Sequence, residues 1–344
     1  MILYTAKLLR TRHLNVAKLS VFVAVLTEHL KSLALAKQKI IMKVLLFLCT
    51  IIFNVLGAQN MYSKDYGNKE NPPVIFIHGG PGGNSTLFES TAAQQLADKG
   101  FYVIVYDRRG EGRSKDENAT MTFKESFEDL LQLYQKYQIK NASILSHSFG
   151  GIMATLFTNQ YPEKVNTLIL AGALFSQQET YDYILKQAKE RFKNDPSKLQ
   201  KIAEIEKLSK NSAAYRKRCY ETASDMNLFT MPHPTPESKQ LRTLYEASDL
   251  YKNNYRNPDS PIKFYQNEAQ NNLDNKGILI SIKKKGIPIF AVYGKDDGIF
   301  SQKQLNDMKN ITGKENFKII DNCSHYLFAD QQEEFLTFIT HVLK

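Results

Sequence analysis

From residue 72 onward, short apolar runs alternate with amphipathic segments along most of the chain. Parallel strands joined by crossover helices produce this alternation, so it predicts an α/β fold with a doubly wound, mostly parallel sheet. The expected strands are Val74–Ile77, Tyr102–Tyr106, Ser143–Ser146, Thr167–Ala171, Ile287–Tyr293 and Phe317–Ile320. The expected helices are Leu87–Lys99, Phe123–Tyr137, Gly151–Tyr161, Gln302–Lys309 and Gln331–Leu343.

Residues 176–285 interrupt this rhythm with a charged, Lys- and Tyr-rich stretch that favours helices and contains several prolines. A structureless loop of that length is implausible inside a compact domain. We therefore expect an inserted helical cap at 176–285, lying over the strand ends where open α/β sheets bind ligands. The sheet core is then divided between residues 59–175 and 286–344.

Two glycine-containing turns follow predicted strands. His78–Gly83 comes directly after Val74–Ile77, and glycines at a strand end leave backbone N–H groups free to face a ligand. Ser146–Gly151 follows a second apolar run and precedes a helix-like segment. Strand, sharp turn and helix around a serine are typical of a nucleophile elbow, here centred on Ser148. Ser146 stands where glycine is usual.

Candidates for the partners of a nucleophilic serine follow further along the chain. Serine catalysis needs a base for the hydroxyl proton and a carboxylate that orients the base. Asp296 and Asp297 end one predicted strand, and His325 follows the last one. Only one of the adjacent aspartates can face the histidine, and Asp297 is favoured.

Other histidines are weaker candidates for the base. His147 beside the elbow is expected to point into the structure, and His78 to fix its own loop. His233 lies in the proline-rich cap and His341 on the last helix, so neither is favoured over His325. The histidines have no metal-ligand spacing, and no dinucleotide fingerprint occurs because proline interrupts Gly79–Gly83. No metal or cofactor is expected.

These motifs, with Asp107–Ser114 and Gly294–Asp297, resemble the marker motifs of the α/β-hydrolase superfamily across residues 61–344. The paired glycines and proline of His78–Gly82 are most similar to those of the prolyl iminopeptidase branch of serine peptidases. The resemblance implies an α/β-hydrolase fold with Ser148 as nucleophile, Asp297 as orienting acid and His325 as base. It also implies that the backbone N–H groups of Gly80 and Phe149 form the oxyanion hole.

The leading hypothesis is a serine hydrolase that cleaves an ester or amide in a small molecule or short peptide through an acyl-enzyme. The specific version is an aminopeptidase resembling prolyl iminopeptidase, and the alternatives are a carboxylesterase and a non-catalytic ligand-binding protein. An aminopeptidase needs a carboxylate for the substrate amine. Within Phe264–Glu268, Glu268 is the first candidate, because it lies near aromatic residues where the cap rejoins the core.

The formal charge of +10 is concentrated near the N-terminus. Residues 1–58 hold eight Lys or Arg against one Glu, and the remainder holds 37 basic against 34 acidic residues. A nearly neutral globular part does not favour nucleic-acid binding. Of the cysteines outside the N-terminal region, Cys219 and Cys323, neither is expected to form a disulfide.

Residues 42–58 have a basic start, a short apolar centre and a small-residue end, which is the layout of a secretory signal peptide. We expect translation to start at Met42, residues 1–41 to be a spurious or non-globular extension, and cleavage after Ala58 to leave an exported protein beginning near Gln59. The alternatives are a membrane anchor over residues 44–58 and a buried helix. Any membrane contact is expected through this segment alone.

Overall fold

The computed structural model describes residues 21, 23–32 and 61–344, which belong to two separate units, Met1–Gln59 and Asn60–Lys344. In the first unit, residues 23–32 are helical and exposed. The signal-peptide-like segment 42–58 lies outside the described residues. Within the described part of the chain, no helix has the length and apolar character needed to cross a membrane.

Residues 61–344 form a seven-stranded sheet with strand order β1-β3-β2-β4-β5-β6-β7. All neighbouring strands are parallel except β1, which pairs antiparallel with β3 at one edge. The strands are β1 (Ser63–Tyr66), β2 (Pro73–Ile77), β3 (Tyr102–Tyr106), β4 (Ala142–His147), β5 (Val165–Ala171), β6 (Ile289–Gly294) and β7 (Phe317–Ile320). The predicted doubly wound, mostly parallel sheet is confirmed, and β1 is an additional strand.

Helices cover both faces of this sheet because the side chains of its strands alternate. On β2, Val74 and Phe76 join one buried cluster with helices α4 and α16, whereas Ile75 and Ile77 join a second cluster with α5 and α6. The helices and turns of this core are α3 (Thr86–Phe88), η1 (Glu89–Ala93), α4 (Gln94–Asp98), α5 (Phe123–Lys136), α6 (Gly150–Gln160), η2 (Pro162–Lys164), α13 (Lys276–Lys284), α14 (Gln302–Thr312), η3 (Lys314–Asn316), α15 (Leu327–Asp330) and α16 (Gln332–Leu343).

Helix starts are encoded locally. Thr122 caps α5 by accepting a hydrogen bond from the backbone N–H of Glu125. Ser301 and Gln304 form a reciprocal capping box at the start of α14. These caps satisfy backbone groups that a helix end would otherwise leave without a partner.

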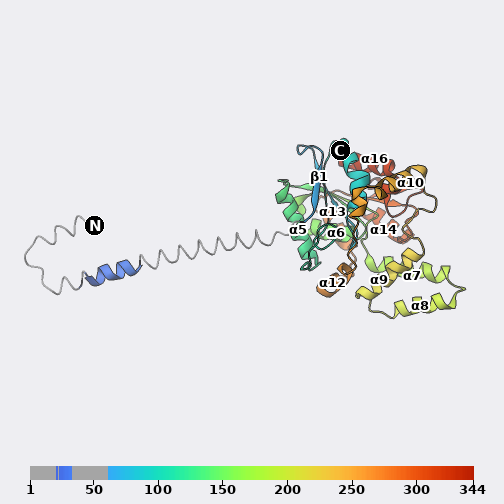
Figure 1. Ribbon diagram of the computed structural model, residues 1–344, viewed down its shortest axis with the longest axis horizontal. Helices are drawn as coiled ribbons and strands as arrows, with labels where there is room; N and C mark the ends of the chain where they lie inside the picture. The colour runs from blue at the N-terminus through green and yellow to red at the C-terminus, as the bar shows by residue number, and fades with distance from the viewer. Residues whose placement is uncertain (1–20, 22, 33–60) are drawn as a thin grey trace, which may run out of the picture. The chain divides into compact units, whose positions relative to one another are not determined.

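The insertion between β5 and α13 is helical. It contains α7 (Gln177–Arg191), α8 (Pro196–Glu206), α9 (Ala213–Asp225), α10 (Pro236–Glu246), α11 (Asp249–Lys252) and α12 (Ser260–Asn267). Its two ends are held together by a bridge between Ser176 and Asp274 and by a 3.0 Å hydrogen bond from Gln177 N to Leu273 O. Figure 1 shows α7, α8 and α9 grouped to one side of the sheet core. We call α7–α12 the cap.

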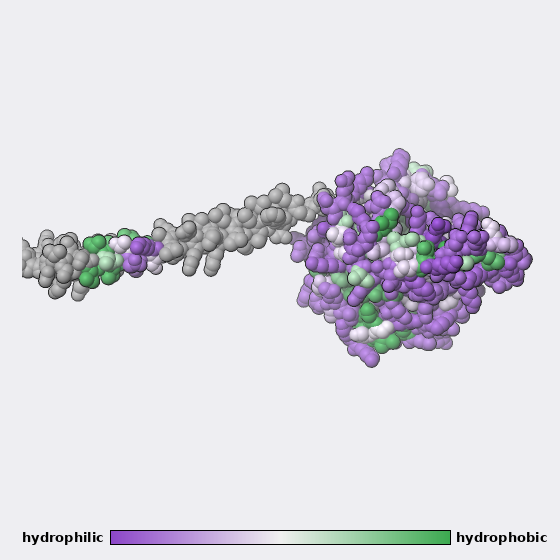
Figure 2. Space-filling view, turned by 90° about the horizontal axis from the view of Figure 1, so that it is seen from below, coloured by the Kyte–Doolittle hydropathy of each residue, from purple (hydrophilic) through white to green (hydrophobic). Residues whose placement is uncertain are grey.

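Helix α13 lies within the segment that the sequence assigned to the cap, yet it packs against α6 and α14 of the core. It is therefore the crossover helix that precedes β6. Cys219 of the cap and Cys323 of the core are both buried and free of disulfides. The surface of residues 61–344 seen in Figure 2 is mostly hydrophilic, with small separate apolar patches.

The strand order reverses at β2, which lies between β3 and β4. In open α/β sheets such a switch point leaves a crevice at the carboxyl ends of the strands on either side. The glycine-rich loop follows β2 and the serine turn follows β4. The topology thus places both sequence motifs at the same edge of the sheet.

Candidate active site

Ser148 occupies a strained turn between β4 and α6. Its φ of 53° lies in the left-handed region that non-glycine residues rarely adopt. The turn also requires close packing, because a Cβ at Gly150 would lie 2.5 Å from the carbonyl oxygen of Ile77. Ser146 fits at the position where glycine is usual, since its Oγ donates to Ile169 O at 3.2 Å.

Asp297 and His325 form a buried pair. Asp297 Oδ2 accepts a 2.8 Å hydrogen bond from His325 Nδ1, and the two side chains are 1 % and 2 % exposed. Asp297 follows β6 and His325 follows β7, which are adjacent strands. Asp296 instead donates its backbone N–H to Cys323 O at 2.8 Å and is half-buried. The structure thus brings Asp297, and not Asp296, to the histidine.

Ser148 and this pair converge around Gly172, the residue after β5. The backbone N–H of Ser148 donates to Gly172 O at 3.2 Å. A Cβ at Gly172 would lie 3.2 Å from His325 O and 3.6 Å from Asp297 Oδ2. Among the described residues no hydrogen bond joins Ser148 Oγ to His325. Such bonds are often long in unliganded enzymes and tighten when substrate binds.

His147 and His78 hold the surrounding backbone. His147 Nε2 donates to His325 O at 2.8 Å, and burial, followed by the nearby His325, lowers the pKa of His147 well below its usual value. His78 Nδ1 donates to Gly79 O at 2.7 Å, while its Nε2 accepts from the backbone N–H of Arg108. Burial lowers the pKa of His78 to about 3. Both imidazoles are neutral and structural.

The backbone N–H groups of Gly80 and Phe149 have no hydrogen-bond partner among the described residues. The carbonyl in the same peptide unit as Gly80 N–H is Gly79 O, which accepts from Arg108 Nη2 and His78 Nδ1, each at 2.7 Å. The corresponding carbonyl for Phe149 N–H is Ser148 O, which accepts from Gly151 N and Leu174 N at 2.9 and 2.8 Å. Hydrogen-bonded chains of this kind polarise one another, so both N–H groups are fixed and strengthened as donors.

The glycine-rich loop depends on an ion pair that the sequence did not assign to the site. Arg108 contacts Glu111 at 2.7 Å and donates to His78 O and Gly79 O. Burial raises the pKa of Glu111, although Arg108 opposes this effect. Gly80 has φ +152°, and a Cβ there would lie 2.4 Å from Arg108 Nη2. The sequence identifies Asp107–Ser114 only as one of the marker motifs, and these contacts connect that segment to the loop beside Ser148.

The cap contacts each part of this site. The ring of Phe229 lies 5.2 Å from that of His325, and Phe264 of α12 lies 5.3 Å from Phe149. Arg216 of α9 donates to Gly80 O. The cap thus brings residues from distant parts of the sequence against His325, Phe149 and Gly80.

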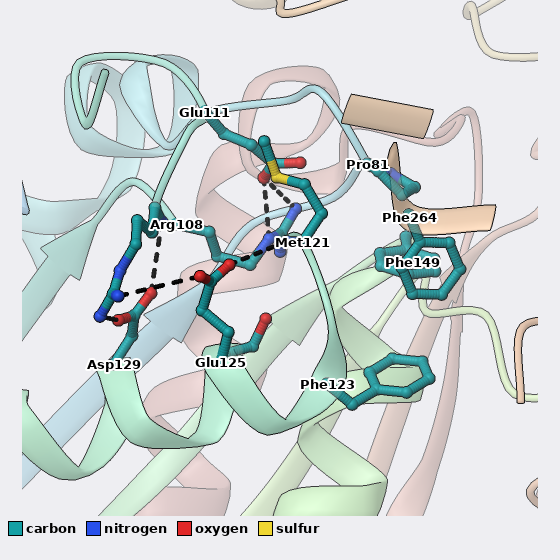
Figure 3. Close-up of a pocket in the computed structure, with 11 residues that line it drawn as sticks. Pro81, Arg108, Glu111, Met121, Phe123, Glu125, Asp129, Phe149 and Phe264 are labelled. Atoms are coloured by element: carbon teal, nitrogen blue, oxygen red, sulfur yellow. Dashed lines mark hydrogen bonds and ion pairs between the residues drawn. The ribbon is translucent and has the colours of Figure 1, made fainter. Parts of the chain in front are cut away.

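A pocket behind Phe149 has one aromatic and one charged end (Figure 3). Phe123, Phe149 and Phe264 form the aromatic end. Burial raises the pKa of Asp129 at the charged end to about 6, although Arg109 opposes this effect. The pocket has room for roughly one water molecule, so we do not assign it to the substrate.

Glu268 lies away from the base and nucleophile contacts described above. Its Oε2 accepts from the backbone N–H of Phe123 at 3.0 Å, and its Oε1 accepts from Gln270 N at 3.2 Å. A carboxylate at the first residue of α5 accepts a hydrogen bond from a backbone N–H group that has no partner within the helix. It also interacts favourably with the positive end of the helix dipole. These contacts give Glu268 a role in joining the cap to α5. Among residues 21, 23–32 and 61–344, no cluster of His, Cys, Asp or Glu could hold a metal ion.

Comparisons with curated proteins return proline iminopeptidases. The protein of Arabidopsis thaliana is 27% identical over 135 residues, and that of Lactobacillus helveticus (strain DPC 4571) is 32% identical over 126. These two matches cover 38% and 35% of this chain, and only 34% and 42% of the relatives' own length. The match with the enzyme of Heyndrickxia coagulans is longer, at 25% identity over 83% of this chain and 95% of the relative.

The solved structure of a proline iminopeptidase-related protein from Thermus thermophilus superposes with a TM-score of 0.60 and 22% identity, covering 83% of this chain and 94% of that one. At that identity the likeness shows the fold alone. The sequence model of the α/β-hydrolase fold family matches residues 72–332, which include the serine turn, the Asp297–His325 pair and the glycine-rich loop. The chain belongs to the α/β-hydrolase fold family and is prolyl iminopeptidase-like.

Proposed function

We propose that this protein is a serine hydrolase that cleaves an ester or amide bond through an acyl-enzyme. Ser148 Oγ attacks the substrate carbonyl carbon, and His325 takes the hydroxyl proton and returns it to the leaving group as the C–O or C–N bond breaks. Water then attacks the acyl-enzyme, again with His325 as base, and releases the acid and free Ser148. The N–H groups of Gly80 and Phe149 bind the oxyanion.

The observation that carries this proposal is that the buried, hydrogen-bonded pair of Asp297 and His325 lies beside Ser148, with Gly172 adjacent to all three residues. A carboxylate on Nδ1 leaves the opposite nitrogen, Nε2, as the proton acceptor. A protein that only binds a ligand has no need of a strained serine, an oriented base and two unpaired N–H groups together. The arrangement therefore favours catalysis over the binding-protein alternative.

Two substrate classes remain within this proposal. The similarity to proline iminopeptidases favours an aminopeptidase acting on short peptides. Two contacts favour a carboxylesterase instead: the Glu268 carboxylate is bound by backbone N–H groups, and the residue that reaches Gly80 from the cap is the cation Arg216. A protonated substrate amine would lack an obvious carboxylate partner there.

The test of mechanism is labelling with a fluorophosphonate probe. We expect wild-type protein to be labelled at Ser148 and Ser148→Ala to lose both labelling and turnover, by about six orders of magnitude in kcat. Ser146→Ala is the matched control, because the buried Ser146 hydroxyl donates to Ile169 O and has no role in the proposed mechanism, so its loss should leave labelling intact. Near wild-type turnover by Ser148→Ala would disprove the mechanism.

The test of substrate class is a panel of prolyl and other aminoacyl amides beside short p-nitrophenyl esters. An aminopeptidase must lose activity when the substrate amine is acylated, because the capped amine no longer carries a charge. Equal activity on capped and free substrates would exclude the aminopeptidase and leave the esterase.

Export is proposed from the sequence alone. The order of basic, apolar and small residues over 42–58 supports a cleaved signal and a periplasmic or secreted protein, with a membrane anchor as the alternative.

A further inference from the structure

Arg216 is a buried cation of the cap that touches the site beside Ser148. It lies on α9, is 9% exposed, and donates from Nη2 to the carbonyl oxygen of Gly80. Its guanidinium carbon lies 5.7 Å from the centre of the Phe149 ring. Arg216 thus contacts both residues whose backbone N–H groups are proposed to bind the oxyanion.

The charge of Arg216 is not balanced in the structure. Within residues 61–344 Arg216 forms no ion pair, and its Nε is buried without a hydrogen-bond partner. Cys219 and Tyr265 face it, but burial raises the pKa of both groups, so neither supplies a negative charge at neutral pH. A buried, unpaired cation is unfavourable unless an anion joins it.

The other arginines near this loop differ from Arg216 in this respect. Arg108 also lies by Phe149, at 5.8 Å, but it is paired with Glu111. Arg109 is paired with Asp129, and Arg113 with Asp107. A purely structural arginine in this part of the fold therefore comes with its own carboxylate, and Arg216 does not.

We propose that Arg216 binds a carboxylate of the substrate, and that the enzyme prefers esters or amides bearing a free carboxylate a few bonds from the scissile carbonyl. This inference rests on the proposed hydrolase function and names its substrate class. A guanidinium suits a carboxylate because it donates several N–H groups in one plane. The carboxylate could lie on the acyl side, as in a dicarboxylic acid monoester, or on the leaving side, as in a dipeptide.

The test uses substrates matched in shape and differing in charge. Monomethyl glutarate is compared with dimethyl glutarate for the acyl side, and the dipeptide Pro-Gly with its C-terminal amide for the leaving side. We expect wild-type enzyme to prefer the carboxylate in at least one pair. Arg216→Gln should lower that preference, measured as the ratio of kcat/KM values, about tenfold or more. Arg216→Lys should restore part of it.

The matched control is Arg218→Gln, because Arg218 lies on the same helix with its side chain exposed. This variant should keep the wild-type ratio. Loss of the preference in Arg218→Gln as well as in Arg216→Gln would indicate a general charge effect and overturn the proposal. Equal rates for acid and neutral partners in both pairs of wild-type enzyme would also overturn it.

Binding separates this inference from the hydrolase proposal. Calorimetric titration of the Ser148→Ala protein with monomethyl glutarate should give at least tenfold tighter binding than with dimethyl glutarate, and Arg216→Gln should remove the difference. This result would support the carboxylate site even if no fluorophosphonate labelling were found. Labelling and turnover without any charge preference would retain the hydrolase and refute the role of Arg216.

Discussion

The contacts of Asp297 predict that the Asp297→Asn variant, in which one carboxylate oxygen becomes an amide nitrogen, should lose most of its activity. Asp297 Oδ2 accepts from His325 Nδ1 at 2.8 Å, and Oδ1 faces the backbone N–H of Ile299 at 3.4 Å. Asparagine has the same shape, and its carbonyl oxygen can keep the contact with Ile299. The amide NH2 then faces His325. Nδ1 must accept a hydrogen bond, so the proton moves to Nε2, which can no longer take the proton of Ser148.

The expected loss follows from this change of tautomer. Replacing the acid of a serine triad by its amide typically lowers kcat about 10⁴-fold, which corresponds to about 5 kcal/mol of transition-state stabilisation. Asp296→Asn is the matched control, since it removes the same charge one residue away and Asp296 makes no hydrogen bond to His325 in the described chain. Its kcat should stay within about twofold of wild type.

The assay is steady-state hydrolysis of the best substrate in the panel of esters and amides, with near-ultraviolet circular dichroism as the check of folding. KM should change little, because the lost interaction acts in the transition state. An Asp297→Asn enzyme that keeps more than a tenth of wild-type kcat would refute the assignment of the acid. A larger loss in Asp296→Asn would transfer the role to that residue.

Three further outcomes are expected. Gly80→Ala should lower kcat about 10²- to 10³-fold because the loop and its N–H must shift, whereas Gly277→Ala, with open space around it, should not, as measured by the same assay. His78 has a pKa of about 3 in the fold against 6.5 ordinarily, so its contribution to stability is lost as pH falls from 6.5 toward 3. At pH 5 the loss is about 2 kcal/mol. His78→Gln should therefore lose less unfolding free energy than wild type between pH 8 and pH 5 in urea titrations, and equal losses would contradict this. N-terminal sequencing of natively produced protein should begin near Gln59, and a start well before Met42 would exclude both the start site and the cleavage.

Most of the parallel sheet was predictable because strands β2 to β6 are short, largely buried apolar runs. Strand β1 was not, since Ser63–Tyr66 is a polar edge strand whose residues are mostly half-exposed. The positions of Ser148, Asp297 and His325 were accessible to the same reasoning. Each follows a predicted strand, and the carboxyl ends of parallel strands meet at one edge of the sheet.

The contacts that the cap makes with the core could not be predicted from the sequence. Because no strand of the sheet lies within α7–α12, strand pairing does not fix the position of these helices against the core. Their charged residues also look alike in sequence. Arg216 reaches Gly80 across 136 positions in the chain, and Glu268 reaches Phe123 across 145. Nothing local distinguishes Arg216 from the exposed Arg218 beside it, so the role of each depends on tertiary packing.

The two proposed oxyanion donors differ in how far the sequence predicts their positions. The position of Phe149 N–H follows from a clear local pattern, whereas that of Gly80 N–H depends on distant side chains. The peptide that carries Phe149 N–H is held by Gly151 N, three residues after Ser148, and by Leu174 N, just after the neighbouring strand. Such local contacts are implied by the strand-turn-helix pattern itself. The peptide that carries Gly80 N–H is held by the side chains of His78 and Arg108, and the next carbonyl along by Arg216 of the cap. Glycines at 79–83 leave the loop free to adopt this shape but do not determine it. Substitutions in Arg108 or the cap can therefore alter the oxyanion hole while the motif around Ser148 stays unchanged.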